Sequence, residues 1–246
     1  MSRSVNRSMS AGSLVPIGGD GEAGAHLVCF PHAGGSEMTY APWRAELADR
    51  YRLWTAARRS PGGGAEGGSG WDTLVSAHAA AVSALPGEIT LYGHSMGALL
   101  AYETARLLRD DGRAVSRLVV SGREAPHIVR RLVVPDDPVE LAKTAADLYG
   151  GIPDELLDDP DMLHVLGQAL MRDYRIFTEY RWRPGEPLDI PLTVFAGADD
   201  PVVGEDGARE WKRHTTGPFQ AVTIPGGHFP GPEGTAAILA TLRESA

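Results

Sequence analysis

The chain has 246 residues, which suits one large domain or a domain with an insertion, and its 43% hydrophobic content is typical of a folded globular protein. Its net charge of −9 argues against nucleic-acid binding through many Lys and Arg contacts to phosphate. No apolar run comes near the roughly 18 residues of a membrane span and no secretory signal pattern is present, so the chain is expected to be cytoplasmic and not bound to a membrane. Its single cysteine, Cys29, predicts that it has no internal disulfide and no cysteine-based zinc site.

Strand and helix patterns follow one another along the chain. Residues 1–24 lack periodicity and predict a flexible N-terminal tail before one domain over 25–246. Helical spacing occurs at 72–84 and at 96–110, where Gly112 fits a C-terminal cap. Short apolar runs predict buried strands at 26–30, 51–56, 89–92, 117–121, 191–196 and 219–224. This alternation predicts an α/β fold, with a mostly parallel sheet covered by helices on both faces.

One interval breaks the alternation. Between Ser121 and Pro191 no strand is evident, but helical patterns occur at 137–149 and 160–182. This stretch is too long for a simple crossover, so it predicts a helical lid inserted over about 123–185. The Gly-rich loop 58–70 matches no phosphate-binding fingerprint, so nucleotide binding is not expected.

A serine lies where a predicted strand meets a predicted helix. Ser95 stands in Gly93-His94-Ser95-Met96-Gly97, and a sharp strand-to-helix turn needs residues without Cβ atoms two positions to either side. At such a turn the Met96 N–H and the positive end of the helix dipole face an oxyanion formed on the serine. We therefore predict Ser95 as a nucleophile in preference to a simple helix cap.

A serine nucleophile needs a base within hydrogen-bond reach. His228 follows the last predicted strand, at the edge of a parallel sheet where ligands bind, and we predict it as the base. A loop histidine without a catalytic task is the alternative. His127, at the edge of the insertion, stays open as another base.

A carboxylate must orient that base. Asp199 and Asp200 both follow the strand at 191–196, and we prefer Asp200 because Pro201 stiffens the turn behind it. The chain order Ser95, Asp200, His228 is that of α/β-hydrolases. A second oxyanion donor is expected from the loop at 30–36, with Ala33 or a neighbour supplying the N–H; a Gly-rich turn without a catalytic task is an equal alternative.

Six motifs together resemble the type II thioesterases that accompany polyketide and nonribosomal peptide synthases. They are FPHAGGS at 30–36, GHSMGA at 93–98, SGREAP at 121–126, EYRW at 179–182, FAGADDP at 195–201 and GGHF at 226–229. One departure is the glycine-rich SPGGGAEGGSG, where family members carry a PGR-type motif. The resemblance implies an α/β-hydrolase that removes acyl or aminoacyl groups from the phosphopantetheine arms of carrier proteins.

On the matching positions, the resemblance implies a nucleophile at Ser95, a base at His228, an orienting Asp200, and oxyanion donors at the amides of Ala33 and Met96. It implies no cofactor and no metal, because the phosphopantetheine arm belongs to the substrate. The expected partners are acyl or peptidyl carrier proteins, with no nucleic acid and no membrane, and the enzyme is expected to be a monomer. A small-molecule carboxylesterase or acyltransferase on the same fold is the alternative, and a non-catalytic carrier-binding scaffold is a further one.

Charge and apolar patterning bear on the substrate. Residues 132–171 hold nine acidic residues and one Lys, a face that would repel an acidic carrier protein. The arginines that flank it form either a docking rim or an ordinary solvated surface; they are Arg123, Arg130, Arg131, Arg172, Arg175, Arg181 and Arg183. Leu148, Tyr149, Leu170 and Phe177 are candidates to line an acyl pocket, with plain helix core as the alternative.

Overall fold

A seven-stranded sheet organises the molecule. The computed structural model describes residues 14–17, 24–57, 70–128 and 134–244, and the strand order is β1-β3-β2-β4-β5-β6-β7. The strands are β1 (Leu14–Pro16), β2 (Ala25–Phe30), β3 (Tyr51–Ala56), β4 (Glu88–His94), β5 (Arg117–Ser121), β6 (Leu192–Gly197) and β7 (Phe219–Ile224). Every pairing is parallel except that of β1 with β3. The predicted α/β fold with a mostly parallel sheet is confirmed.

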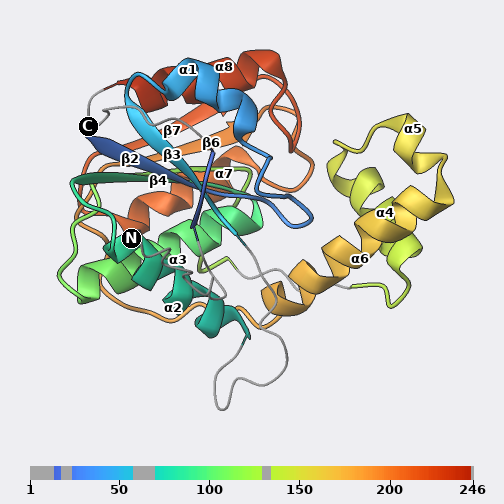
Figure 1. Ribbon diagram of the computed structural model, residues 1–246, viewed down its shortest axis with the longest axis horizontal. Coiled ribbons are helices and arrows are strands. Elements are labelled where there is room, and N and C mark those ends of the chain that lie inside the picture. The colour runs from blue at the N-terminus through green and yellow to red at the C-terminus, as the bar shows by residue number, and fades with distance from the viewer. Residues whose placement is uncertain (1–13, 18–23, 58–69, 129–133, 245–246) are drawn as a thin grey trace, which may run out of the picture.

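Helices cover both faces of the sheet. Figure 1 shows α1 and α8 on one side of it and α2 and α3 on the other. The helices are α1 (Arg44–Leu47), α2 (Gly70–Ser83), α3 (Met96–Asp110), α4 (Pro138–Tyr149), α5 (Asp154–Leu157), α6 (Pro160–Phe177), α7 (Glu205–Arg209) and α8 (Pro232–Arg243), with 3₁₀ turns η1 (Ala41–Trp43) and η2 (Glu210–His214). Among these described helices, none has both the length and the apolar character of a membrane span.

The alternation of side chains along the strands builds two cores. Val28 and Phe30 of β2 pack with α2 and α3, whereas Leu27 and Cys29 pack with the α1 and α8 side. Because successive strand residues point to opposite faces, a strand buried on both faces reads as one continuous apolar run. This describes β2, β4, β5 and β6, whereas β3 exposes Arg52 and the edge strand β7 exposes three of its six residues. All six predicted strands are confirmed.

The N-terminal prediction needs a correction. Residues Leu14–Pro16 lie inside the predicted flexible tail 1–24, but they form strand β1. This strand pairs with β3, whose outward-facing backbone groups would otherwise be unpaired at the sheet edge. The remainder of that tail lies outside the described residues, apart from Ile17 and Gly24. The predicted loop 58–70 also lies outside them, except for Gly70, which begins α2.

The predicted insertion contains α4, α5 and α6. They lie between β5 and β6 in sequence, and Figure 1 shows them grouped beyond one end of the sheet. The predicted helix over 160–182 is too long, because α6 ends at Phe177 and Thr178 caps it. Residues 178–182 instead turn back over α3, and Pro184 disfavours helix at the residue before it.

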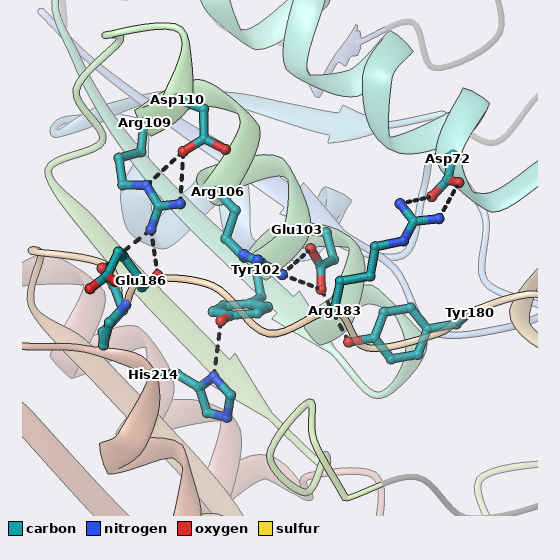
Figure 2. Close-up of polar contacts among 11 residues, drawn as sticks. Asp72, Tyr102, Glu103, Arg106, Arg109, Asp110, Tyr180, Arg183, Glu186 and His214 are labelled. Atoms are coloured by element: carbon teal, nitrogen blue, oxygen red, sulfur yellow. Dashed lines mark hydrogen bonds and ion pairs between the residues drawn. The ribbon is translucent and has the colours of Figure 1, made fainter. Parts of the chain in front are cut away.

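Polar contacts attach the segment after α6 to the body of the molecule. In Figure 2, Tyr180 and Arg106 both point at the carboxylate of Glu103 on α3. Tyr180 donates to Glu103 Oε1 at 3.1 Å, and the Arg106 guanidinium lies 3.0 Å from Oε2. Further along the segment, Arg183 pairs with Asp72 of α2 at 2.9 Å, and Arg109 donates to the carbonyls of Glu186 and Pro187.

Candidate active site

Ser95 occupies a strained turn between β4 and α3. Its φ of 56° makes it the one non-glycine residue with positive φ in the described part of the chain. A Cβ on Gly93 would overlap the Gly97 carbonyl, and a Cβ on Gly97 would overlap the Phe30 carbonyl. The two glycines therefore let β4, α3 and the end of β2 approach closely enough to hold the serine in this conformation.

Three side chains from the carboxyl ends of separate strands meet at this turn. His228 Nε2 lies 3.0 Å from Ser95 Oγ, and His228 Nδ1 lies 2.9 Å from Asp200 Oδ2. Asp200 follows β6 and His228 follows β7, and both side chains are buried. With Nδ1–H donating to the carboxylate, Nε2 is left with a lone pair facing the serine hydroxyl. The structure thus brings together the three residues predicted from the sequence.

Backbone amides fix the orienting carboxylate. Asp200 Oδ1 accepts hydrogen bonds from the Val202 and Val203 amides at 2.9 and 3.1 Å. Burial raises the pKa of Asp200, but the bond from His228 and these two amides outweigh burial, so its pKa lies below the usual value. Asp199, the alternative, is exposed and contacts the loop through its own amide, which donates to Gly226.

His94 lies beneath the base. Its Nδ1 is 2.8 Å from Ser121 Oγ, its ring centroid is 5.1 Å from that of His228, and its Nε2 is buried without a partner in the described residues. Burial, and next the neighbouring imidazole of His228, hold its pKa well below 6.5. His94 is therefore a neutral ring that packs against the base without adding charge beside it.

The two predicted oxyanion donors, Ala33 and Met96, border one small cavity together with Ser95. Met96 begins α3, so its N–H has no acceptor within the helix, and Ala33 lies in the loop after β2 and lines the cavity at Ser95. The neighbouring Gly34 amide donates to Asp173 Oδ2 of α6 at 2.7 Å. The buried Asp173 thus ties this loop to the helical insertion. Asp173 was not predicted from the sequence, although a carboxylate on the apolar face of an amphipathic helix was a usable signal.

A cavity of about 310 Å³ opens beside Ser95 and His228. The insertion supplies most of its apolar wall, including Leu156, Leu166, Leu170 and Tyr149. Leu170 and Tyr149 were predicted to line such a pocket. Leu148 was predicted with them, and this is wrong: it is 44% exposed, because it faces outward on α4. Phe177 lines a second, smaller cavity that shares Ser95.

Other predicted residues lie elsewhere. His127 is the open alternative to His228. Its Nδ1 lies 2.8 Å from His214 Nε2 and its Nε2 lies 3.2 Å from Glu210 Oε2, so it belongs to a separate hydrogen-bonded group and not to the site at Ser95.

Of the predicted docking rim, Arg130 and Arg131 lie outside the described residues, and Arg172, Arg175, Arg181 and Arg183 are exposed. The prediction of Arg123 as a rim residue is wrong, because its side chain turns inward and its guanidinium carbon lies 4.9 Å from the centroid of the Phe177 ring. No group of metal-binding side chains occurs within the described ranges.

Comparisons with known proteins show the family of the chain. Residues 25–245 match the family model described as "Thioesterase domain". The "Probable cadicidin biosynthesis thioesterase" of Streptomyces griseus is 35% identical over 211 residues, covering 82% of this chain and 57% of that protein. "Thioesterase PikA5" of Streptomyces venezuelae is 34% identical over 212 residues, covering 82% of this chain and 74% of its own length. The chain therefore spans little more than half of the first relative.

Solved structures share the overall fold. The type II thioesterase BorB from the borrelidin biosynthetic cluster has a TM-score of 0.78 at 32% identity, covering 94% of this chain and 96% of that one. The RedJ thioesterase of the prodiginine pathway in Streptomyces coelicolor has a TM-score of 0.74 at 33% identity, covering 90% and 85%.

Proposed function

The chain belongs to the thioesterase domain family, and on that premise we propose that it hydrolyses the thioester bonds that join acyl or aminoacyl groups to the phosphopantetheine arms of carrier proteins. The family predicted from the sequence is confirmed, and relatives bear names from polyketide and peptide antibiotic pathways. Such an enzyme would clear stalled or wrongly loaded groups from a modular synthase.

One observation carries the proposal: the hydrogen-bonded series Ser95–His228–Asp200 beside an apolar cavity. In the first step His228 Nε2 takes the proton of Ser95 Oγ, and the oxygen attacks the thioester carbonyl carbon. The tetrahedral intermediate then expels the carrier's sulfur, which receives the proton from His228. Water enters, loses a proton to His228, and attacks the acyl–Ser95 ester. When this second intermediate collapses, His228 returns the proton to Ser95 Oγ, so the acid leaves and the serine is regenerated.

The surroundings of Ser95 favour both tetrahedral intermediates. We assign the oxyanion to the amides of Ala33 and Met96, at the N-terminus of α3, where the helix dipole is positive. The ionised Asp200 stabilises the imidazolium that forms on His228. A thiol with a pKa of about 8.5 leaves readily, so protonation of the leaving group matters less than in a peptidase.

The proposal needs no cofactor, because the phosphopantetheine arm arrives with the substrate. The partners it implies are acyl or peptidyl carrier proteins, in keeping with a solved relative, YbtT, described as a type II thioesterase from the yersiniabactin NRPS/PKS biosynthetic pathway. A monomeric state and a cytoplasmic location stay predictions from the sequence.

The test is intact-protein mass spectrometry of carrier proteins loaded with acetyl, longer acyl and aminoacyl groups, after incubation with the enzyme. The proposal predicts loss of the acyl mass with the natural protein and retention of it with Ser95→Ala. The same preparation is assayed on free aryl esters. Equal or better turnover of aryl esters would favour a small-molecule esterase, and unchanged carriers with no ester turnover would favour a binding scaffold.

A further inference from the structure

The helical insertion touches the catalytic base directly. Tyr149 is the last residue of α4, and its ring centroid lies 4.6 Å from that of the His228 imidazole, with the two ring planes inclined by 44°. Among the rings of the described residues, none lies closer to the imidazole. A residue of the insertion therefore forms part of the wall that surrounds the base.

The turn after Tyr149 packs against the loop that carries the base. Gly150 ends α4, and both Gly150 and Gly151 have positive φ, at 67° and 78°. A Cβ on Gly151 would overlap the ring of Phe229, the residue after His228. The chain thus turns sharply at the end of α4, and the insertion and this loop meet over a wider area than one ring.

The body of the molecule contacts the base through other groups. The rings of His94 and Phe229 have centroids 5.1 and 5.3 Å from that of His228. A Cβ on Gly122 would lie 3.4 Å from His228 Cε1. These three residues belong to the sheet and its loops, whereas Tyr149 belongs to the insertion. Together the surroundings leave the His228 side chain only 3% exposed.

Hydrogen bonds alone do not fix the position of this imidazole. The bond between His228 Nδ1 and Asp200 holds one side of the ring, and a ring that tilts about this bond carries Nε2 away from the serine. The bond between Nε2 and Ser95 Oγ cannot prevent the tilt throughout the reaction, because Oγ gives up its proton. Van der Waals contacts with neighbouring rings must supply the remaining restraint.

On the premise of the proposed hydrolysis at Ser95, we propose that Tyr149 is a positioning residue, whose ring holds His228 in the orientation that faces the serine. Asp173, also in the insertion, bonds to the loop that carries Ala33. The insertion therefore supports the base as well as the oxyanion loop, and it does more than cover the acyl group.

Steady-state kinetics with acetyl-pantetheine and octanoyl-pantetheine test this role. Tyr149→Leu keeps an apolar side chain in the cavity beside Ser95 but removes the ring. It should lower kcat about 10- to 100-fold on both substrates with little change in either KM, because a small misplacement of a catalytic group costs this much rate. Tyr149→Phe keeps the ring and should retain most of the natural kcat. Leu148→Ala, at the exposed neighbouring position on α4, is the control and should change neither constant.

A residue that only lines the cavity gives a different pattern. In that case Tyr149→Leu will raise KM for the octanoyl substrate and leave acetyl turnover unaltered, and this result overturns the proposal. A natural kcat in Tyr149→Leu also overturns it, as does an equal loss in Tyr149→Phe, which would assign the role to the hydroxyl. Should Tyr149→Leu fail to fold, Tyr149→Met, which also lacks a ring and suits a helix, is measured against the same expectations.

Labelling by a methyl fluorophosphonate separates the role of Tyr149 from thioester hydrolysis. The probe reports activation of Ser95 by its base, and its methyl group leaves most of the cavity empty. The maximal labelling rate at Ser95 should fall about 10- to 100-fold in Tyr149→Leu and stay near the natural rate in Tyr149→Phe. Equal rates in Tyr149→Leu and the natural protein would overturn the role of Tyr149.

The natural protein itself separates the two proposals. If it labels rapidly but turns over no thioester, the proposed hydrolysis is overturned, and the labelling rates of the variants still decide the role of Tyr149. If it shows neither labelling nor turnover, both proposals are overturned.

Discussion

At the scale of single residues, the two aspartates after β6 have different surroundings. Asp200 bonds to His228 and to two backbone amides, whereas its neighbour Asp199 is exposed. An orienting carboxylate must fix the tautomer of the base and stabilise the imidazolium. The geometry therefore assigns this task to Asp200, which the sequence favoured for its reach across the sheet edge and the proline behind it, and which the family resemblance implied.

Asp200→Asn should lower kcat by about 10³- to 10⁴-fold, because an amide cannot stabilise the imidazolium and can hold the wrong tautomer. Asp199→Asn, one residue away, should keep close to full activity. Steady-state kinetics on one acyl thioester compare the two variants. Similar losses in both, or a greater loss in Asp199→Asn, would show that the orienting role is misassigned.

The contact between Asp173 and Gly34 leads to a second prediction. Asp173→Ala leaves the Gly34 amide without its acceptor and frees the loop that carries Ala33, so kcat should fall by about tenfold with little change in KM. Asp161→Ala, at an exposed site on the same helix, is the matched control. A rise in KM with constant kcat would mean that Asp173 serves substrate binding and not the oxyanion loop.

At the scale of elements, the contacts of Figure 2 make Glu103 the buried centre of an attachment between α3 and the segment after α6. Glu103→Ala should lower the free energy of unfolding by about 1–3 kcal/mol, because Arg106 and Tyr180 lose their common partner in a largely buried site. Asp72→Ala removes a pair whose two side chains are 43% and 71% exposed, and its effect should be too small to measure. Urea denaturation at neutral pH measures both. Equal effects would contradict this difference in burial.

The elements that the sequence predicted are those whose burial leaves a simple pattern. Strands β2, β4, β5 and β6 read as apolar runs because both their faces are covered, and α3 has a regular apolar stripe ended by Gly112. The edge strand β7 exposes three of its six residues, and its β-branched residues made it predictable instead. The three-residue β1 and the short α1, α5 and α7 carry too few residues to show a period, and their position is decided by tertiary packing. Helix α8, at 232–243, was also not predicted.

The residues of the candidate site also differ in how far the sequence predicts them. Ser95, Asp200 and His228 were predictable because each follows a strand in a motif with local chemistry. The contact of Asp173 and the inward position of Arg123 were not, since they depend on which face of α6 meets the loop after β2 and on a turn after β5 that points inward. The position of Asp173 on the apolar face of α6 indicates that it is buried, but one sequence does not show which distant group it contacts.

At the scale of the whole molecule, buried histidines couple stability to pH. Burial, and next the charge of His127, lower the pKa of His214 from 6.5 to about 4. Burial also lowers the pKa of His94. Between pH 6.5 and about 4 the unfolded chain binds a proton at each of these sites and the folded chain does not, so the free energy of unfolding falls as the pH falls.

Each such histidine contributes up to about 1.4 kcal/mol of lost stability per pH unit in this window. Denaturation curves between pH 7 and 5 should therefore show a shallower loss in His214→Gln than in the natural protein. His164→Gln, on the exposed face of α6, is the control and should keep the original slope. An unchanged slope in His214→Gln would contradict a neutral His214 in the folded state.

Hydrolysis at this site depends on activation of Ser95 by His228. Mass spectrometry of the protein treated with a fluorophosphonate measures this directly, because the probe phosphonylates an activated serine. We expect one adduct per chain, on the peptide that contains Ser95, and a labelling rate at least about 10³-fold lower in His228→Ala. An adduct on another residue, or equal labelling rates in the two proteins, would contradict the central claim.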